Sequence, residues 1–243
     1  MKLPRLCSRR TLVLSLAALL AVVAATMAIW AAIAGPVTVY RVARHGDTQI
    51  DDFKHYPARP LAASDAPFRF ADATAQGRVP ATETSRDGQP IALGDFLLRN
   101  DTIAFVVVKG DALAFEAYYQ GHEASSLSQV FSVSKSVTSV LIGAALQDGL
   151  IRSVDQPITD FVPELAANGF DRVTLRHLLT MTSGSSYIED DNPFGIHVIL
   201  NYIPDIEGEI LGFRVVDEPG TIWRYTSGDN ALLALALRRA PRR

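Results

Sequence analysis

The pattern of hydrophobic and polar residues separates an apolar run near the start of the chain from a mixed remainder. Residues 1–10 carry basic side chains and no acidic ones, and residues 11–34 carry no charged side chain. A helix needs about 20 apolar residues to cross the hydrocarbon layer of a membrane. We therefore predict a membrane-spanning helix over 11–34, with a cytoplasmic basic tail over 1–10 and the rest of the chain outside.

A cleaved signal sequence is the alternative interpretation of the same run. Ala32-Ile33-Ala34 has the small-x-small pattern of a cleavage site, and Gly35 follows it. The apolar part of a signal peptide is usually about 7–15 residues long, so the length of this run favours a retained anchor. The first interpretation gives a single-pass protein of the cell membrane with a periplasmic domain. The second gives a secreted protein.

The segment after the apolar run changes from turn-rich to strand-like sequence. Prolines and turn-forming residues interrupt residues 35–94, which predicts an extended lead-in. Two runs rich in β-branched and aromatic residues follow, at 102–108 and 112–119. Turn-forming residues at 109–111 separate them, so we predict a β-hairpin.

Helical patterns dominate the second half of the chain. Residues 132–147 are uncharged except at Lys135, and a helix that is apolar nearly all round is normally buried. A short helix is predicted over 173–179, and a last apolar helix over 229–237. Residues 185–222 show no sustained periodicity, so we expect loops with short elements there.

Composition and charge exclude several classes of function. The chain has 243 residues, of which 48% are hydrophobic and 20% charged, as in ordinary globular proteins. Its 23 basic and 26 acidic side chains give a net charge of −3, which leaves no positive surplus to bind nucleic acid. One cysteine, Cys7, and five scattered histidines form no metal-binding pattern. We predict no metal, no cofactor and no nucleic-acid partner.

Ser132 and Lys135 form the first candidate for chemistry. They are three residues apart, so on a helix they share a face with Cβ atoms about 5–6 Å apart. Ser132 would lie in the first turn, where the helix dipole favours developing negative charge. A hydroxyl beside an amine that can take its proton is an activated nucleophile. The alternative is a helix-capping serine followed by a lysine that extends into solvent.

Three segments together resemble the serine β-lactamases and penicillin-binding proteins. They are Phe131–Ser136 (FSVSKS), Thr174–Gly184 (TLRHLLTMTSG) and Glu218–Ser227 (EPGTIWRYTS). The likeness covers about 95–237 and is nearest to the class C β-lactamase-related hydrolases, close to 6-aminohexanoate-dimer hydrolases. It implies an α+β fold, an antiparallel sheet flanked by helices plus an all-helical region, with residues 95–243 forming a partial domain.

The resemblance implies a role for each matching residue. Ser132 would be the acylated nucleophile, and Lys135 the general base or the group that holds the base in its anionic form. Tyr225 would relay the proton to the leaving group. Ser227 stands where class C β-lactamases have asparagine, which is closer to the esterase and aminohexanoate-amide branch. Ser227 and Tyr187 are the predicted substrate-binding residues.

The irregular segment 185–215 is expected to line the substrate cleft. Its candidate rim contacts are Tyr187 and the acidic residues Glu189, Asp190 and Asp191. Acidic side chains at a rim would favour a substrate with a cationic end. The alternative for each of these acidic residues is a solvated position in an acidic loop.

One expected motif is missing from the sequence. The resemblance implies a Lys-Thr-Gly or His-x-Gly strand after the tyrosine, and nothing after Ser227 matches it. That strand would supply one oxyanion-hole donor, whose loss typically costs about 10²–10³ in rate. We therefore expect a truncated domain that lacks its C-terminal sheet strands and is impaired in folding or activity.

The function predicted from the sequence is hydrolysis of a small-molecule amide or ester through an acyl-enzyme on Ser132. Two alternatives stay open at this point. The first is a degenerate, non-catalytic binding module that keeps only the front of the fold. The second is a cell-wall D-alanyl peptidase.

Overall fold

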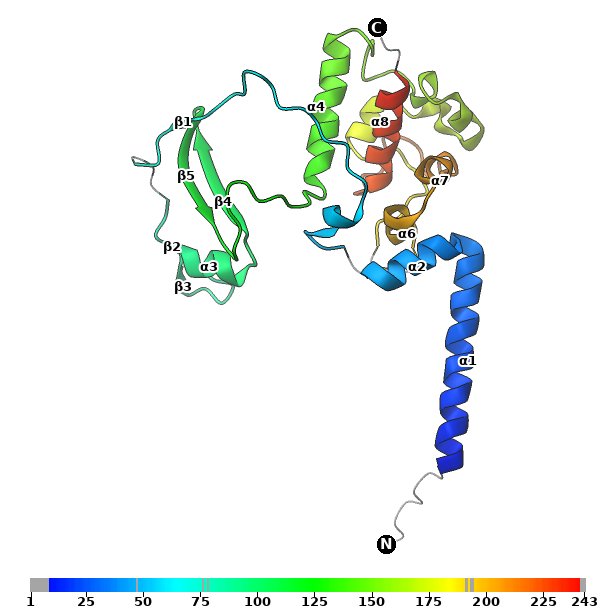
Figure 1. Ribbon diagram of the computed structural model, residues 1–243. Coiled ribbons are helices and arrows are strands. Elements are labelled where there is room, and N and C mark those ends of the chain that lie inside the picture. The colour runs from blue at the N-terminus through cyan, green and yellow to red at the C-terminus, as the bar shows by residue number, and fades with distance from the viewer. Residues whose placement is uncertain are drawn as a thin grey trace. The chain divides into compact units, whose positions relative to one another are not determined.

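The computed structural model describes residues 9–46, 48–75, 77, 79–190, 192 and 195–240. These residues form two compact units. One unit runs from Gln49 to Gln129, and the other combines the chain up to Thr48 with the chain from Val130 onward. Figure 1 labels the helices and strands of both units.

A three-stranded sheet in the order β1-β5-β4 organises the unit 49–129. Strands β4 (Ala104–Lys109) and β5 (Ala112–Tyr118) pair antiparallel, and β1 (Ala71–Asp72) adds to β5 in parallel. The backbone at Gly110 and Asp111 has φ of 54° and 59°, as both central residues of a type I′ hairpin turn require. The predicted hairpin is therefore confirmed.

The lead-in has more structure than its sequence predicted. Strands β2 (Thr82–Thr84) and β3 (Pro90–Ala92) form a two-stranded antiparallel sheet, and α3 (Leu93–Arg99) follows. A single 3₁₀ turn, η1 (Asp52–His55), precedes them. Most of the rest of residues 49–94 has neither helix nor strand, in agreement with an extended lead-in.

Helices form most of the other unit after Val130. They are α4 (Val133–Gln147), α5 (Leu175–Leu179), α6 (Ile196–Tyr202), α7 (Ile206–Leu211) and α8 (Ser227–Arg239), with 3₁₀ turns η2 (Ile158–Asp160), η3 (Pro163–Asn168) and η4 (Phe170–Arg172). Within the described part of this unit, the β structure after Val130 consists of two isolated bridges, Pro157 with Thr174 and Ser185 with Val215. The predicted helices over 132–147, 173–179 and 229–237 are all present, with shifted ends.

The hydrophobic core of this unit lies around α8, α5 and the 3₁₀ turns. Its fully buried side chains include Ile158, Leu165, Phe170, Leu175 and Leu232. Helix α5 begins with a reciprocal cap, in which Thr174 accepts from the His177 N–H and the His177 ring accepts from the Thr174 N–H. This cap fixes the segment that leads to Met181 and Gly184.

Helix α4 is not the buried helix that its sequence predicted. Only Thr138, Ile142 and Ala145 are buried, on the side that packs against α8 (Figure 1). Val133 and Val140 on the rest of its surface are 63% and 71% exposed. A helix that is apolar on every side is buried only where neighbouring elements cover all of its sides. Helix α8 covers the side of α4 that carries the three buried residues.

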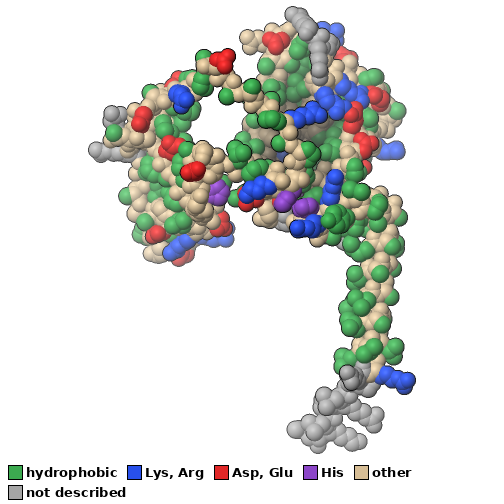
Figure 2. All heavy atoms as spheres, viewed as in Figure 1, with side chains coloured by type: hydrophobic (Ala, Val, Ile, Leu, Met, Phe, Trp, Pro, Cys, Tyr) green, Lys and Arg blue, Asp and Glu red, His purple; other side chains and the backbone are tan. Residues whose placement is uncertain are grey.

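Helices α1 (Arg9–Ala34) and α2 (Pro36–His45) begin the chain's described part. Among the described residues, α1 is the one helix long and apolar enough to cross a membrane, a test that a signal sequence also passes. Figure 2 shows hydrophobic side chains along its length. Gly35, with φ of 84°, breaks the helix direction, and α2 then packs on the end of α1 around Trp30 and Val39. The sequence did not predict α2.

Candidate active site

Ser132 lies directly before the first residue of α4. Phe131 ahead of it has a φ of 43°, a left-handed conformation that is uncommon for a bulky residue and often marks a functional turn. Ser132 occupies the N-cap position, but its side chain makes no capping hydrogen bond to the helix. The hydroxyl is exposed and turned toward other side chains, which contradicts the alternative of a capping serine.

Two side chains converge on the Ser132 hydroxyl. The Lys135 ammonium donates to Ser132 Oγ over 2.9 Å, from one turn further along α4. The Tyr225 hydroxyl donates to the same oxygen over 2.7 Å. Lys135 Nζ also lies 5.0 Å from the centre of the Tyr225 ring. The structure therefore brings together all three residues predicted to be catalytic, and the half-buried Lys135 points at the alcohol rather than into solvent.

The segment before α8 brings Tyr225 to this position. The Arg224 N–H donates to the Met181 carbonyl over 3.1 Å, and the Gly220 N–H donates to the Thr182 carbonyl over 2.8 Å. The two later segments of the predicted motif set, 174–184 and 218–227, thus run side by side. Tyr225 itself is 39% exposed, and these backbone anchors hold the segment from which its ring reaches Lys135 and Ser132.

Gly184 allows the closest backbone approach in this region. Its φ is 72°, and a Cβ atom there would come within 2.2 Å of the Asp217 carbonyl oxygen. The Val216 and Asp217 N–H groups both donate to the Gly184 carbonyl. Only glycine meets both conditions, which explains the Ser-Gly sequence at the end of the second motif.

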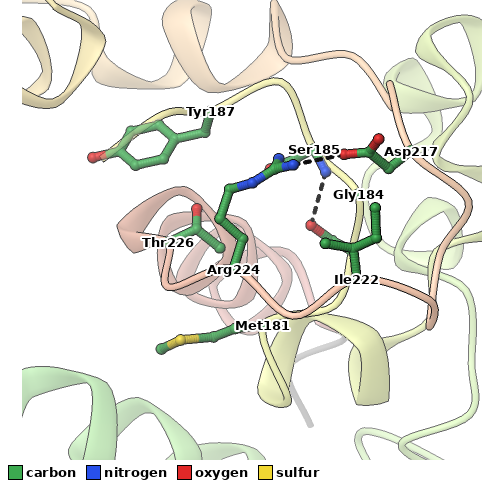
Figure 3. A pocket seen from close by; sticks show the side chains of 9 residues that line it. Met181, Gly184, Ser185, Tyr187, Asp217, Ile222, Arg224 and Thr226 are labelled. Carbon is green, nitrogen blue, oxygen red and sulfur yellow. Dashed lines mark hydrogen bonds and ion pairs between the residues drawn. The ribbon is translucent and has the colours of Figure 1, made fainter. Parts of the chain in front are cut away.

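A small cavity lies behind the anchored segment (Figure 3). Its volume of about 10 Å³ is room for about one water molecule and too little for a substrate. Its lining comes from both motif segments, and Arg224 reaches across to Asp217 at 2.9 Å.

The two predicted substrate-binding residues differ in exposure. Ser227 is half-buried in the first turn of α8, and both its N–H and its hydroxyl donate to Glu189, over 2.5 and 3.0 Å. Tyr187 is 1% exposed, so the expectation that its side chain lies at an open rim is wrong. Its hydroxyl instead hydrogen-bonds His197 Nδ1 over 2.8 Å. The irregular segment folded inward because Tyr187 packs against Phe213 and joins the core.

The other candidate rim residues are dispersed. The Glu189 side chain is 18% exposed and is occupied by Ser227. Asp190 is exposed and accepts from the Asn192 N–H over 3.2 Å. Asp191 lies outside the described residues. Among the residues that the structure describes, no cluster of three or more histidine, cysteine or acidic side chains could hold a metal ion.

Two titratable groups in this region have strongly shifted pKa values. Burial raises the pKa of Tyr187 well above its ordinary value, and the charge of Glu189 raises it further, while a hydrogen bond with Ser227 acts in the opposite direction. Tyr187 therefore stays neutral. Burial also raises the pKa of Asp229 to about 7, although the Ser183 hydroxyl donates to its Oδ1 over 2.6 Å and favours the charged form.

Sequence reasoning missed the buried carboxyl group of Asp229 and the partners of Glu189. The sequence pattern predicts Asp229 only as the start of the last helix. An acidic residue that opens an otherwise apolar helix was the available signal, because such a carboxyl group is drawn in with the helix when the apolar face is buried. The contact between Glu189 and Ser227 left no signal in the sequence, since 38 residues separate them.

Comparison with known proteins agrees with this geometry. Residues 99–241, more than half of the chain, match the sequence profile of the family described as beta-lactamase. The chain belongs to the beta-lactamase family. The resemblance inferred from the three motifs is therefore confirmed.

The relatives of this beta-lactamase family member include hydrolases. The 6-aminohexanoate-dimer hydrolase of Paenarthrobacter ureafaciens is 29% identical over 158 residues, which cover 62% of this chain and 40% of the relative. The solved structure "Putative 6-aminohexanoate-dimer hydrolase from Bacillus anthracis" superposes with a TM-score of 0.54 at 22% identity, covering 72% of this chain and 48% of that one. The latter match supports the β-lactamase/transpeptidase-like fold. The chain thus spans less than half the length of either relative.

Proposed function

We propose that this chain is a serine hydrolase that cleaves a small amide or ester through an acyl-enzyme on Ser132. The convergence of Lys135 and Tyr225 on the Ser132 hydroxyl, at 2.9 and 2.7 Å, carries the proposal. A serine alcohol is a weak nucleophile until a neighbouring group removes its proton. Membership of the beta-lactamase family and the hydrolase relatives support the same reaction class.

In the acylation step, Ser132 Oγ forms a bond to the substrate carbonyl carbon and loses its proton. The neutral amine of Lys135 accepts that proton, or a Tyr225 phenolate paired with the Lys135 ammonium accepts it. The resulting oxyanion is stabilised by the N-terminal end of α4. When the intermediate collapses, the bond to the leaving nitrogen or oxygen breaks and Tyr225 supplies it with a proton. If Lys135 took the serine proton, Lys135 then passes that proton to Tyr225, so the base is free again. Water then hydrolyses the acyl-enzyme through the same base and restores the serine.

Ser227 is the proposed contact for the substrate. Its hydroxyl donates to Glu189, which leaves the lone pairs of the oxygen able to accept a hydrogen bond. A substrate N–H group, as found in an amide, fits that acceptor. The name of the Paenarthrobacter relative, which refers to the dimer of 6-aminohexanoate, supports an amide substrate for this chain as well.

We also propose that α1 anchors the protein in the cell membrane with the catalytic region outside the cytoplasm. The length and hydropathy of α1 support the anchor, and the basic side chains before it in the sequence favour a cytoplasmic N-terminus. The test is carbonate extraction of membranes that contain the full chain, followed by mass spectrometry of its N-terminus. A retained anchor stays in the membrane pellet with its first residues present. A soluble product that begins after Ala34 would overturn the anchor in favour of secretion.

The catalytic proposal is tested with the full chain in membranes or mild detergent. The probes are a fluorophosphonate, a p-nitrophenyl ester and the linear dimer of 6-aminohexanoate. We expect covalent label on Ser132 and loss of all label and turnover in Ser132→Ala. Ser134→Ala, a matched change two residues away, should leave both unchanged. Label on Ser134 or Ser183 would overturn the assignment, and binding of substrate without label would favour the non-catalytic module.

A further inference from the structure

Glu189 forms an unusual cap on α8. The first N–H groups of a helix have no partner inside the helix and are usually satisfied by the N-cap side chain. Here the N-cap is Thr226, whose side chain makes no capping bond and whose buried hydroxyl has no partner among the described residues. Glu189 supplies the acceptor instead, from 38 residues earlier in the chain.

The two oxygens of Glu189 hold one residue at two points. Oε2 accepts the Ser227 N–H over 2.5 Å, and Oε1 accepts the Ser227 hydroxyl over 3.0 Å. A carboxylate at a helix N-terminus is also favoured by the helix dipole. Since one oxygen of Glu189 holds the backbone and the other holds the side chain, Ser227 cannot rotate or shift without breaking one of these bonds.

The two hydrogen bonds between Glu189 and Ser227 also restrict the position of Tyr225, two residues earlier. The chain around Tyr225 is anchored on one side by the bond from the Arg224 N–H to Met181 and on the other by Ser227 on Glu189. The Tyr225 ring is 39% exposed and its hydroxyl reaches Ser132. The two anchors hold the backbone on both sides of Tyr225, and the ring contacts Lys135 and Ser132 from there.

The residues behind Glu189 keep it in place. Tyr187 packs against the first turn of α8, where Gly228 leaves room, because a Cβ there would lie 2.7 Å from the Tyr187 ring. The Tyr187 hydroxyl bonds His197 Nδ1, and that nitrogen lies 3.9 Å from Glu189 Oε1. Tyr187, His197 and Glu189 therefore form a connected layer beneath Ser227.

We propose that Glu189 is a positioning residue of the active site, which holds Ser227 and through it the Tyr225 phenol against Ser132. This inference rests on the proposed hydrolase function. It replaces the rim-contact role expected from the sequence, because the Glu189 side chain is 18% exposed and both of its oxygens accept from Ser227. Glu189 acts on proton transfer through Tyr225 and does not contact the substrate.

The test compares Glu189→Gln with wild type in ester turnover. The amide keeps one acceptor and loses the other, so we expect kcat to fall about 10–100-fold. KM should rise by a smaller factor, because Ser227, the proposed substrate contact, is also less firmly held. Asp171→Asn, the same type of change at an exposed site in η4, should leave both unchanged. A rise in KM with unchanged kcat would overturn the proposal in favour of a substrate contact.

A double-mutant cycle with Tyr225→Phe separates positioning from a general loss of structure. Because Glu189 acts through the Tyr225 hydroxyl, Glu189→Gln should cost less than about threefold in a Tyr225→Phe background. Multiplying losses would overturn the proposal. Hydrogen exchange gives a readout that needs no activity, since the Ser227 amide should exchange faster in Glu189→Ala, which has no side-chain acceptor. Unchanged exchange would overturn the proposal even in a chain without turnover, whereas failure of Ser132 to react would overturn only the hydrolase function.

Discussion

The Tyr225 hydroxyl donates to Ser132 Oγ over 2.7 Å, although 93 residues separate them in the chain. Lys135 reaches the same oxygen from within α4. The first contact depends on tertiary structure and the second on helix geometry. Removing either partner therefore tests a different part of the proposed proton path.

Replacing Tyr225 by phenylalanine should lower kcat for ester hydrolysis about 10²–10³-fold, since a positioned acid–base group typically contributes about 10²–10⁴-fold. KM should change little, because the ring and the backbone stay in place. Steady-state kinetics with a p-nitrophenyl ester would measure this. Tyr40→Phe, at an exposed position of α2, is the matched control. Wild-type kcat in Tyr225→Phe would contradict the relay role.

Replacing Lys135 by methionine keeps the apolar part of the side chain and removes the amine. Both versions of the mechanism use that amine, either as the base or as the cation that holds a Tyr225 phenolate. We therefore expect fluorophosphonate labelling of Ser132 to slow at least about 10³-fold. Lys109→Met, at the exposed end of β4, should label at the wild-type rate. Normal labelling of Lys135→Met would show that the amine only fills space.

The sequence predicted the local parts of the site better than the tertiary parts. The helix start at Ser132 and the i, i+3 spacing to Lys135 follow from local periodicity, and so does the hairpin turn at Gly110. The exposure of α4 and the burial of Tyr187 were missed. The exposure of α4 and the burial of Tyr187 both depend on which distant segment packs against them. The local sequence pattern does not show which segment that is. The hydrogen bonds between Glu189 and Ser227 also join residues that are far apart in the sequence, so local pattern does not predict them.

The stability of the chain should depend on pH through Asp229. Burial raises its folded-state pKa to about 7, above the ordinary value of 3.8 that applies after unfolding. Between these values the folded state holds a proton that the unfolded state has released. The free energy of unfolding should therefore fall as pH rises from about 4 to about 7 and level off above that.

Asp229→Asn removes the free-energy cost of ionising a buried carboxyl group and keeps an acceptor for the Ser183 hydroxyl. At pH 8 the variant should be more stable than wild type by about 2–4 kcal/mol, and at pH 4 the two should be similar. Urea unfolding at both pH values measures the difference. Asp171→Asn is the exposed control. A difference that stays the same at both pH values would mean that Asp229 is not the titrating group.

Gly184→Ala tests the close approach between the two motif segments. The new Cβ would lie 2.2 Å from the Asp217 carbonyl oxygen, at a φ of 72°. We expect a loss of stability of about 2 kcal/mol or more, together with slower labelling of Ser132, because the segment that carries Tyr225 must move.

Gly143→Ala is the matched control. It lies within exposed α4 with nothing within 4 Å of its Cβ. That change should stabilise the chain by about 0.5–1 kcal/mol through helix propensity. Thermal unfolding of both variants decides the point. Equal effects at the two glycines would mean that the 181–184 and 217–224 segments are not held as closely as the structure places them.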